Sequence, residues 1–108
     1  MTAYNIVRMR VKPGFEDKFV AHHDSLVQTI GSELKAAGMR RFTLVKTGDR
    51  SYCVIGEWDG FDSIVKARPA MISSLDGLRP MLEDLGDDLG VTDPVSGEAA
   101  AEYDMADH

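Results

Sequence analysis

Apolar and polar residues alternate near the start of the chain, and this alternation predicts a β-strand over residues 4–12 (YNIVRMRVK). One set of alternate positions begins at Asn5 and is mostly apolar, and the other carries Arg8 and Arg10. A period of two with β-branched and aromatic residues is typical of a strand. Pro13 and Gly14 then end it, because this pair favours a turn.

Helical spacing follows the first strand. A mostly apolar stripe that includes one histidine recurs at three- and four-residue steps, at Phe15, Phe19, His22, Leu26, Ile30, Leu34 and Ala37. This stripe predicts an amphipathic helix. We expect it to end at Gly38, because a left-handed glycine is a common helix cap.

The remaining segments predict a hairpin, a helical region and a last strand. Residues 39–47 and 51–58 are expected to be strands joined by a tight turn. Helical spacing returns from Ile64 to Leu85, with Pro69 and Pro80 expected to divide it into two or three short helices. Residues 86–97 are predicted as loop, 98–104 as the last strand, and 105–108 as a frayed end.

The predicted order is therefore βαββαβ, a single ferredoxin-like α+β domain spanning residues 1–108. Such a domain has a four-stranded antiparallel sheet with both helices on one face. The other face should then be polar in a monomer. Here both sets of alternate positions on the first strand carry apolar residues, so we expect a homodimer packed through the open sheet face.

Charged residues are distributed unevenly along the chain, and their distribution bears on which partners the protein can bind. The 108 residues include 12 basic and 18 acidic side chains, giving a net charge of −6. Every Lys and Arg lies between Arg8 and Arg79, whereas residues 80–108 carry only carboxylates. We therefore expect no nucleic-acid partner, and we expect the acidic segment to lie along the basic first strand or on the partner subunit.

Several other functional classes are also disfavoured. No apolar run is long enough to span a membrane, and the first residues do not have the pattern of a signal peptide. Cys53 is the single cysteine, so no intramolecular disulfide can form, and a cytoplasmic location is the simplest expectation. No metal site or cofactor is expected, because one cysteine and three histidines make a structural zinc site improbable and no phosphate-binding glycine motif occurs.

Three stretches resemble the antibiotic-biosynthesis-monooxygenase (ABM) domain family: YNIVRMRVKPGFEDKF, GEWDGFDS and GVTDPVSG. The resemblance implies a dimeric α+β barrel. It also implies an activity, since some members oxidise polycyclic phenols to quinones without a cofactor and related ones degrade haem. Trp58 matches the strand-end Trp of the phenol-oxidising members, but their strand Asn falls at Val54 and their helix Tyr near Ile64. Asn5 is similar to the first-strand Asn of haem-degrading members, whose helix Trp and His are missing from residues 61–75.

Six residues are candidates for a site. Asn5, Trp58 and His22 are the catalytic candidates: an amide that holds a substrate oxygen, an indole that stacks on a planar ring, and a base that titrates near pH 7. Arg8, Tyr52 and His23 are the candidates for substrate binding, through the guanidinium fork, the phenol and the imidazole. Each has a plain structural alternative. These are core packing for Trp58 and the histidines, pairing with backbone at a strand edge for Asn5, a solvated or ion-paired strand face for Arg8, and an ordinary strand tyrosine for Tyr52.

Two functions follow from this reading. The first is a cofactor-independent monooxygenase-like enzyme that acts on an aromatic or quinone-like small molecule. The second is a non-catalytic homodimer that binds a small molecule or has a structural role. A pocket between sheet and helices, lined by Trp58 and a convergent polar group, would favour the enzyme.

Overall fold

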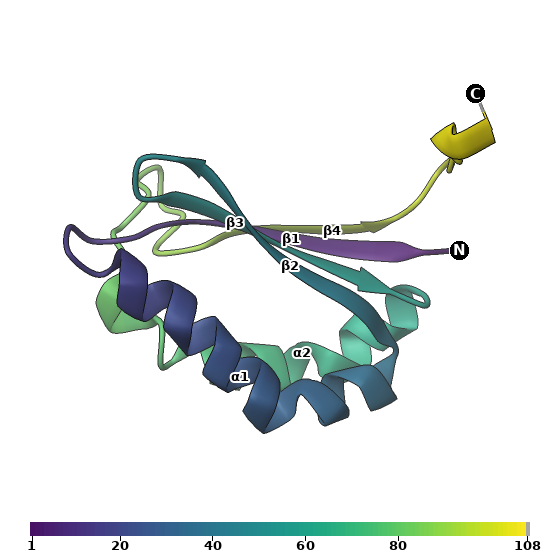
Figure 1. Cartoon of the computed structure of the whole chain (residues 1–108), viewed down its shortest axis with the longest axis horizontal. Helices are drawn as coiled ribbons and strands as arrows, with labels where there is room; N and C mark the ends of the chain where they lie inside the picture. The colour runs from purple at the N-terminus through teal and green to yellow at the C-terminus, as the bar shows by residue number, and fades with distance from the viewer. Residues whose placement is uncertain (108) are drawn as a thin grey trace.

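A four-stranded antiparallel sheet with two helices on one face forms the molecule, as the computed structural model of residues 1–107 shows (Figure 1). The elements in chain order are β1 (Ala3–Arg10), α1 (Glu16–Ala37), β2 (Met39–Gly48), β3 (Ser51–Trp58), α2 (Phe61–Leu75) and β4 (Asp93–Glu98). Two short 3-10 turns, Arg79–Met81 and Met105–Asp107, follow α2 and β4. The predicted βαββαβ order and ferredoxin-like α+β class are confirmed.

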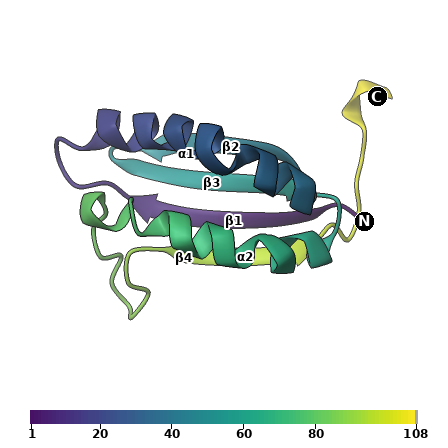
Figure 2. The ribbon, with the colours of Figure 1, turned by 90° about the horizontal axis from the view of Figure 1, so that it is seen from below.

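The strands lie in the order β2-β3-β1-β4, so the first and last strands are neighbours. Figure 2 shows α1 lying across β2 and β3, and α2 across β1 and β4. Paired residues on neighbouring strands point to the same side of the sheet. Asn5 pairs with Gly56 and Val7 with Val54 on the helix-covered side, while Ile6 pairs with Ile55 on the open side.

The core fills the space between the sheet and the two helices. Trp58 and Phe19 are its largest fully buried side chains, each 0% exposed. Burying a side chain of this size stabilises the fold by about 1.5–3 kcal/mol. Phe19 packs in one cluster with Met9 and Tyr52, and Trp58 packs in a second cluster with Leu34 and Ile64.

The first helix ends as its sequence predicts. Gly38 has a φ of 117°, in the left-handed region, and its backbone N–H bonds to carbonyls of the last turn. A side chain at this position would also collide with Ser63 at the start of α2. Glycine is therefore required both by the backbone conformation and by the close approach of the second helix.

Two predictions about the second half of the chain are wrong. Helix α2 continues through Pro69, which removes only one backbone hydrogen bond, while Pro80 lies in the separate 3-10 turn as a break predicts. The last strand is β4 (Asp93–Glu98), not residues 98–104, because pairing with β1 runs from Arg8↔Asp93 to Ala3↔Glu98. The expected frayed end includes the turn Met105–Asp107, and residue 108 lies outside the described residues.

Part of the acidic segment lies against the basic part of the chain, as expected from the charge pattern. Asp93 forms an ion pair with Arg8 at 3.2 Å, and Glu83 forms one with Arg50 at 2.7 Å. Both pairs are within one subunit. They join the segment after α2 to β1 and to the β2–β3 turn. Within the described part of the chain, no helix is both long and apolar enough to cross a membrane.

Candidate functional site

A hydrogen-bonded pair of side chains, Asn5 and Trp58, lies on the helix-covered face of the sheet. The Trp58 indole Nε1–H donates to the Asn5 Oδ1 at 2.6 Å. An indole nitrogen only donates, so the amide oxygen of Asn5 must face Trp58 and its NH₂ group must face elsewhere. Trp58 therefore sets the orientation of the Asn5 amide.

Gly56, opposite Asn5 on β3, makes room for this pair. A Cβ atom at position 56 would lie 2.7 Å from the Trp58 Nε1 and closer still to the Asn5 Oδ1. Since real Cβ contacts below 3.0 Å are essentially never seen, any side chain here would displace one partner. The hydrogen bond between two residues 53 positions apart thus depends on a third residue with no side chain.

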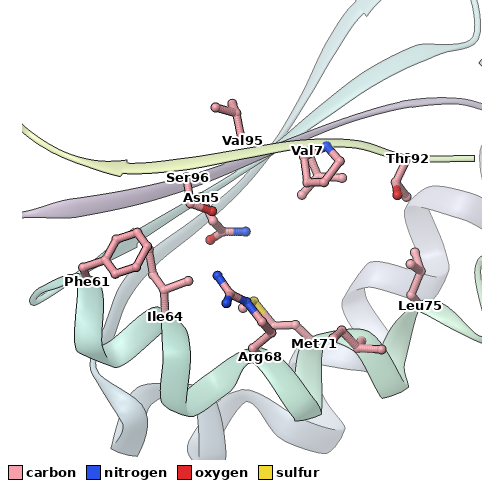
Figure 3. A pocket seen from close by; sticks show the side chains of 12 residues that line it. Asn5, Val7, Phe61, Ile64, Arg68, Met71, Leu75, Thr92, Val95 and Ser96 are labelled. Atoms are coloured by element: carbon pink, nitrogen blue, oxygen red, sulfur yellow. The ribbon is translucent and has the colours of Figure 1, made fainter. Parts of the chain in front are cut away.

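Asn5 lines a pocket of about 600 Å³ between α2 and strands β1 and β4, here called the outer pocket (Figure 3). Most of its walls are apolar, and four polar residues take part. Its lining residues are Asn5, Val7, Phe61, Ile64, Arg68, Met71, Ile72, Leu75, Thr92, Pro94, Val95 and Ser96. A concave, mostly apolar site with a few polar groups is the usual form of a small-molecule site.

Arg68 is the only charged residue that lines the outer pocket. Its side chain extends from α2 toward the sheet, below the Asn5 amide (Figure 3). Among the side chains of residues 1–106, Arg68 is in none of the ion pairs or side-chain hydrogen bonds. Sequence reasoning missed this residue, although its spacing from Ile64, Met71 and Leu75 places it on the inward side of α2.

A second, smaller space of about 90 Å³, here called the inner cavity, lies between the sheet and both helices. It shares Asn5, Val7, Met71 and Leu75 with the outer pocket, so the two adjoin at Asn5. His23 lines the inner cavity and is 6% exposed.

His23 is held in its neutral form. Burial lowers its pKa below the usual 6.5, an effect that a hydrogen bond to the Phe19 carbonyl partly opposes. That bond, at 2.8 Å, places the proton of the neutral ring on Nδ1, because a carbonyl only accepts. Nε2 is then the nitrogen that can take up a proton.

The other candidate residues lie away from the outer pocket. His22 was expected in the apolar stripe, but its neighbour His23 points into the core instead, and His22 packs beside Gly77. Arg8 lies on the open face, where it pairs with Asp93. Trp58 is fully buried and does not line the pocket, so the expectation that it stacks on a ligand there is wrong.

Tyr52 is also distant from the outer pocket and belongs to an ion-paired cluster. Its hydroxyl donates to the Glu16 carboxylate at 2.6 Å, and Lys46 contacts the same oxygen at 2.9 Å. The Tyr52 hydrogen bond, followed by the Lys46 contact, lowers the pKa of Glu16. The same hydrogen bond raises the pKa of Tyr52, so this phenol stays protonated.

Metal ligands do not gather anywhere in the described part of the chain. Among the side chains of residues 1–106, no group of three or more His, Cys, Asp or Glu is arranged to hold a metal ion. The polar groups of the outer pocket are instead an amide, a guanidinium and two hydroxyls. Their chemistry is that of hydrogen bonding to an organic ligand.

Comparison with known proteins places the fold. No family model matches the chain, and no curated protein matches it. A dimeric ferredoxin-like protein from an uncultured marine organism superposes with a TM-score of 0.72 at 17% identity, covering 94% of this chain and 90% of that one. A variant of SnoaB, a cofactor-independent oxygenase from Streptomyces nogalater, gives a TM-score of 0.70 at 17% identity over 94% and 95%.

A proposed antibiotic biosynthesis monooxygenase from Chloroflexus aurantiacus superposes with a TM-score of 0.63 at 15% identity, over 96% of this chain and 98% of that one. At such identities the likeness concerns the fold alone. The resemblance to the ABM family is confirmed at that level. The chain has the same ferredoxin-like fold as these three proteins.

Proposed function

We propose that the outer pocket binds an aromatic or quinone-like small molecule and that the protein oxidises it with molecular oxygen without a cofactor. The observation that carries the proposal is the Asn5–Trp58 pair, which presents an oriented amide at the edge of an apolar pocket. Similarity in fold to a cofactor-independent oxygenase supports it.

The reaction class needs little from the protein beyond orientation. An electron-rich phenol with a free ring position can itself reduce oxygen: one oxygen atom enters the ring, the other leaves as water, and the two hydrogens lost from the phenol end in that water. In this scheme Asn5 donates a hydrogen bond to the substrate oxygen from its Nδ2. Trp58 is a positioning residue, because it holds Asn5 and does not reach the pocket.

His23 is the residue best suited to take the phenolic proton. It lines the inner cavity that adjoins Asn5, and its neutral ring has Nε2 as acceptor. Removing the proton raises the electron density of the ring and makes electron transfer to oxygen easier. This role belongs to His23 rather than His22, which lies outside both spaces.

The alternative function, a non-catalytic small-molecule-binding protein, is favoured by two observations. Trp58 is 0% exposed, so it acts as a core residue as well as a partner of Asn5. Val54 also stands where the phenol-oxidising members carry their strand Asn. Under this alternative the same pocket binds and releases a ligand without changing it chemically.

Oxygen uptake with a panel of naphthols and hydroquinones separates the two functions. If Asn5 stabilises charge that develops on the substrate, Asn5→Ala should lower kcat/KM by about 10²-fold or more. Gln28→Ala, which removes an exposed amide from α1, should have no effect. Ligand binding without any oxygen uptake would establish the alternative, and unchanged turnover in Asn5→Ala would refute the role of the pair.

We also propose that two copies of the chain pack through the open sheet face. Ile6, Cys53, Ile55 and Val45 are half-buried on this face, and the side chain of Val95 is 62% exposed there. Figure 1 shows α1 and α2 together on the opposite side of the sheet. A similar fold described as dimeric supports the proposal.

Light scattering after size exclusion tests the dimer. Ile55→Asp places a charge in the middle of the open face and should convert the protein to a monomer, because a buried unpaired charge is costly. Val65→Asp adds the same charge at an exposed position on α2 and should leave the dimer intact. A monomeric wild-type protein would contradict the proposal.

A further inference from the structure

Arg68 faces the outer pocket without an acidic neighbour in its lining. Glu and Asp are absent from the residues that line this pocket, and the guanidinium is in no ion pair among the side chains of residues 1–106. Some other arginines are neutralised by a neighbouring carboxylate, as Arg8 is by Asp93 and Arg40 by Asp59. The outer pocket therefore has a positive charge available at its mouth.

The two strongest polar groups of the pocket, on Arg68 and Asn5, offer it hydrogen-bond donors. A guanidinium has five donors and no acceptor. The Asn5 amide is both donor and acceptor, but its oxygen already accepts from the Trp58 Nε1–H at 2.6 Å, and this bond orients the amide so that its NH₂ is free for a ligand. Figure 3 shows the Asn5 amide and the Arg68 guanidinium on facing sides of the pocket, one on the sheet and one on α2.

Around these donors the walls are apolar and suit a flat ring. Phe61, Ile64 and Met71 contribute from α2, and Val7 from β1. A volume of about 600 Å³ lies within the range of about 300–1,000 Å³ that is usual for small-molecule sites. A ligand that satisfies both features needs an aromatic body and an anionic, acceptor-only group at one end.

We propose that Arg68 and Asn5 form a donor pair that selects aromatic anions, namely carboxylates or phenolates, over their neutral counterparts. Arg68 is the specificity-determining residue of the two, because its planar fork matches a carboxylate or an oxyanion with two parallel hydrogen bonds. The inference rests on the proposed function only in that the outer pocket binds an aromatic molecule. It does not need the oxidation step.

Calorimetric titration with a matched ligand pair tests the selection. At pH 7.5 the probe 2-naphthoate is an anion, whereas 2-naphthamide has nearly the same shape and is neutral. We expect wild-type protein to bind the naphthoate at least about tenfold more tightly. Arg68→Gln should abolish this preference and leave naphthamide binding unchanged, and Arg68→Lys should restore only part of it.

Lys66→Gln is the matched control, because it removes the same charge from an exposed position on the same helix outside the pocket lining. It should retain the preference. Equal binding of the two probes by wild type, binding of neither probe, or equal losses in Arg68→Gln and Lys66→Gln would each overturn the proposal. The two proposals can also fail separately. If Arg68→Gln loses the preference but the wild-type protein consumes no oxygen with phenols, the anion site is supported and only the oxygenase function is refuted.

Discussion

Replacing Gly56 with alanine should disrupt the hydrogen-bonded pair Asn5–Trp58, although Gly56 itself has no side chain and is not part of that bond. The new methyl group would lie 2.7 Å from the Trp58 Nε1 and closer to the Asn5 Oδ1, so the hydrogen bond and the packing of a fully buried indole cannot both persist. Neither neighbour is the end of a long flexible chain. The strain must therefore move an indole or an amide fixed by packing.

The size of the effect follows from three contributions. Overpacking a well-packed core costs about 1–3 kcal/mol, and losing one hydrogen bond costs about 0.5–1.5 kcal/mol. Alanine offsets about 0.4–1 kcal/mol of this, because it reduces the entropy of the unfolded chain. We expect the free energy of unfolding to fall by about 0.5–4 kcal/mol, and the upper part of this range is a large share of the total stability of a small domain.

Urea unfolding followed by circular dichroism measures this change. Gly97→Ala is the control, because Gly97 also lies in a strand but a Cβ there meets no atom within 4 Å. It should alter the free energy of unfolding by less than about 0.5 kcal/mol. Trp58→Phe removes the Nε1 atom that the new methyl group would meet. Gly56→Ala should therefore lower the free energy of unfolding less in the Trp58→Phe background than in the wild type. If Gly56→Ala is as stable as Gly97→Ala, the close packing around Asn5 is refuted.

Two further predictions concern pH and the acidic end of the chain. Because the folded state lowers the pKa of His23 below 6.5, the unfolded chain binds this proton more readily, and stability should fall as pH drops below about 6.5. Urea unfolding can be measured from pH 7.5 to 5.5, where carboxylates stay ionised. The loss of stability should appear in wild type and in His22→Gln but not in His23→Gln. An equal loss in His23→Gln would show that another group causes it. Removing residues 94–108 deletes the pairing of β4 with β1 and should destabilise the protein strongly, whereas removing residues 100–108 should change unfolding by less than about 0.5 kcal/mol. Equal stability of the two truncated chains would show that β4 contributes nothing.

The order of strands and helices, the cap at Gly38 and the two faces of β1 could all be predicted from the sequence. Each is a local property: alternation with period two, apolar spacing of three and four, and one glycine suited to a left-handed turn. The predicted position of the last strand failed, since β4 is defined by its hydrogen bonds to β1 and not by its own propensity. Pro69 failed as a helix breaker for a related reason, because packing of α2 on the sheet outweighs one missing hydrogen bond.

The candidate site depends far more on tertiary structure. The sequence singled out Asn5 and Trp58 separately, but only the antiparallel register of β1 and β3 brings their side chains together over Gly56. His22 and His23 differ by about 100° around the helix, so the docking of α1 decides which of them is buried. Arg68 belongs to the site because α2 lies across β1 and β4. Local periodicity determined the elements, whereas contacts between residues distant in the chain decided which side chains share a pocket.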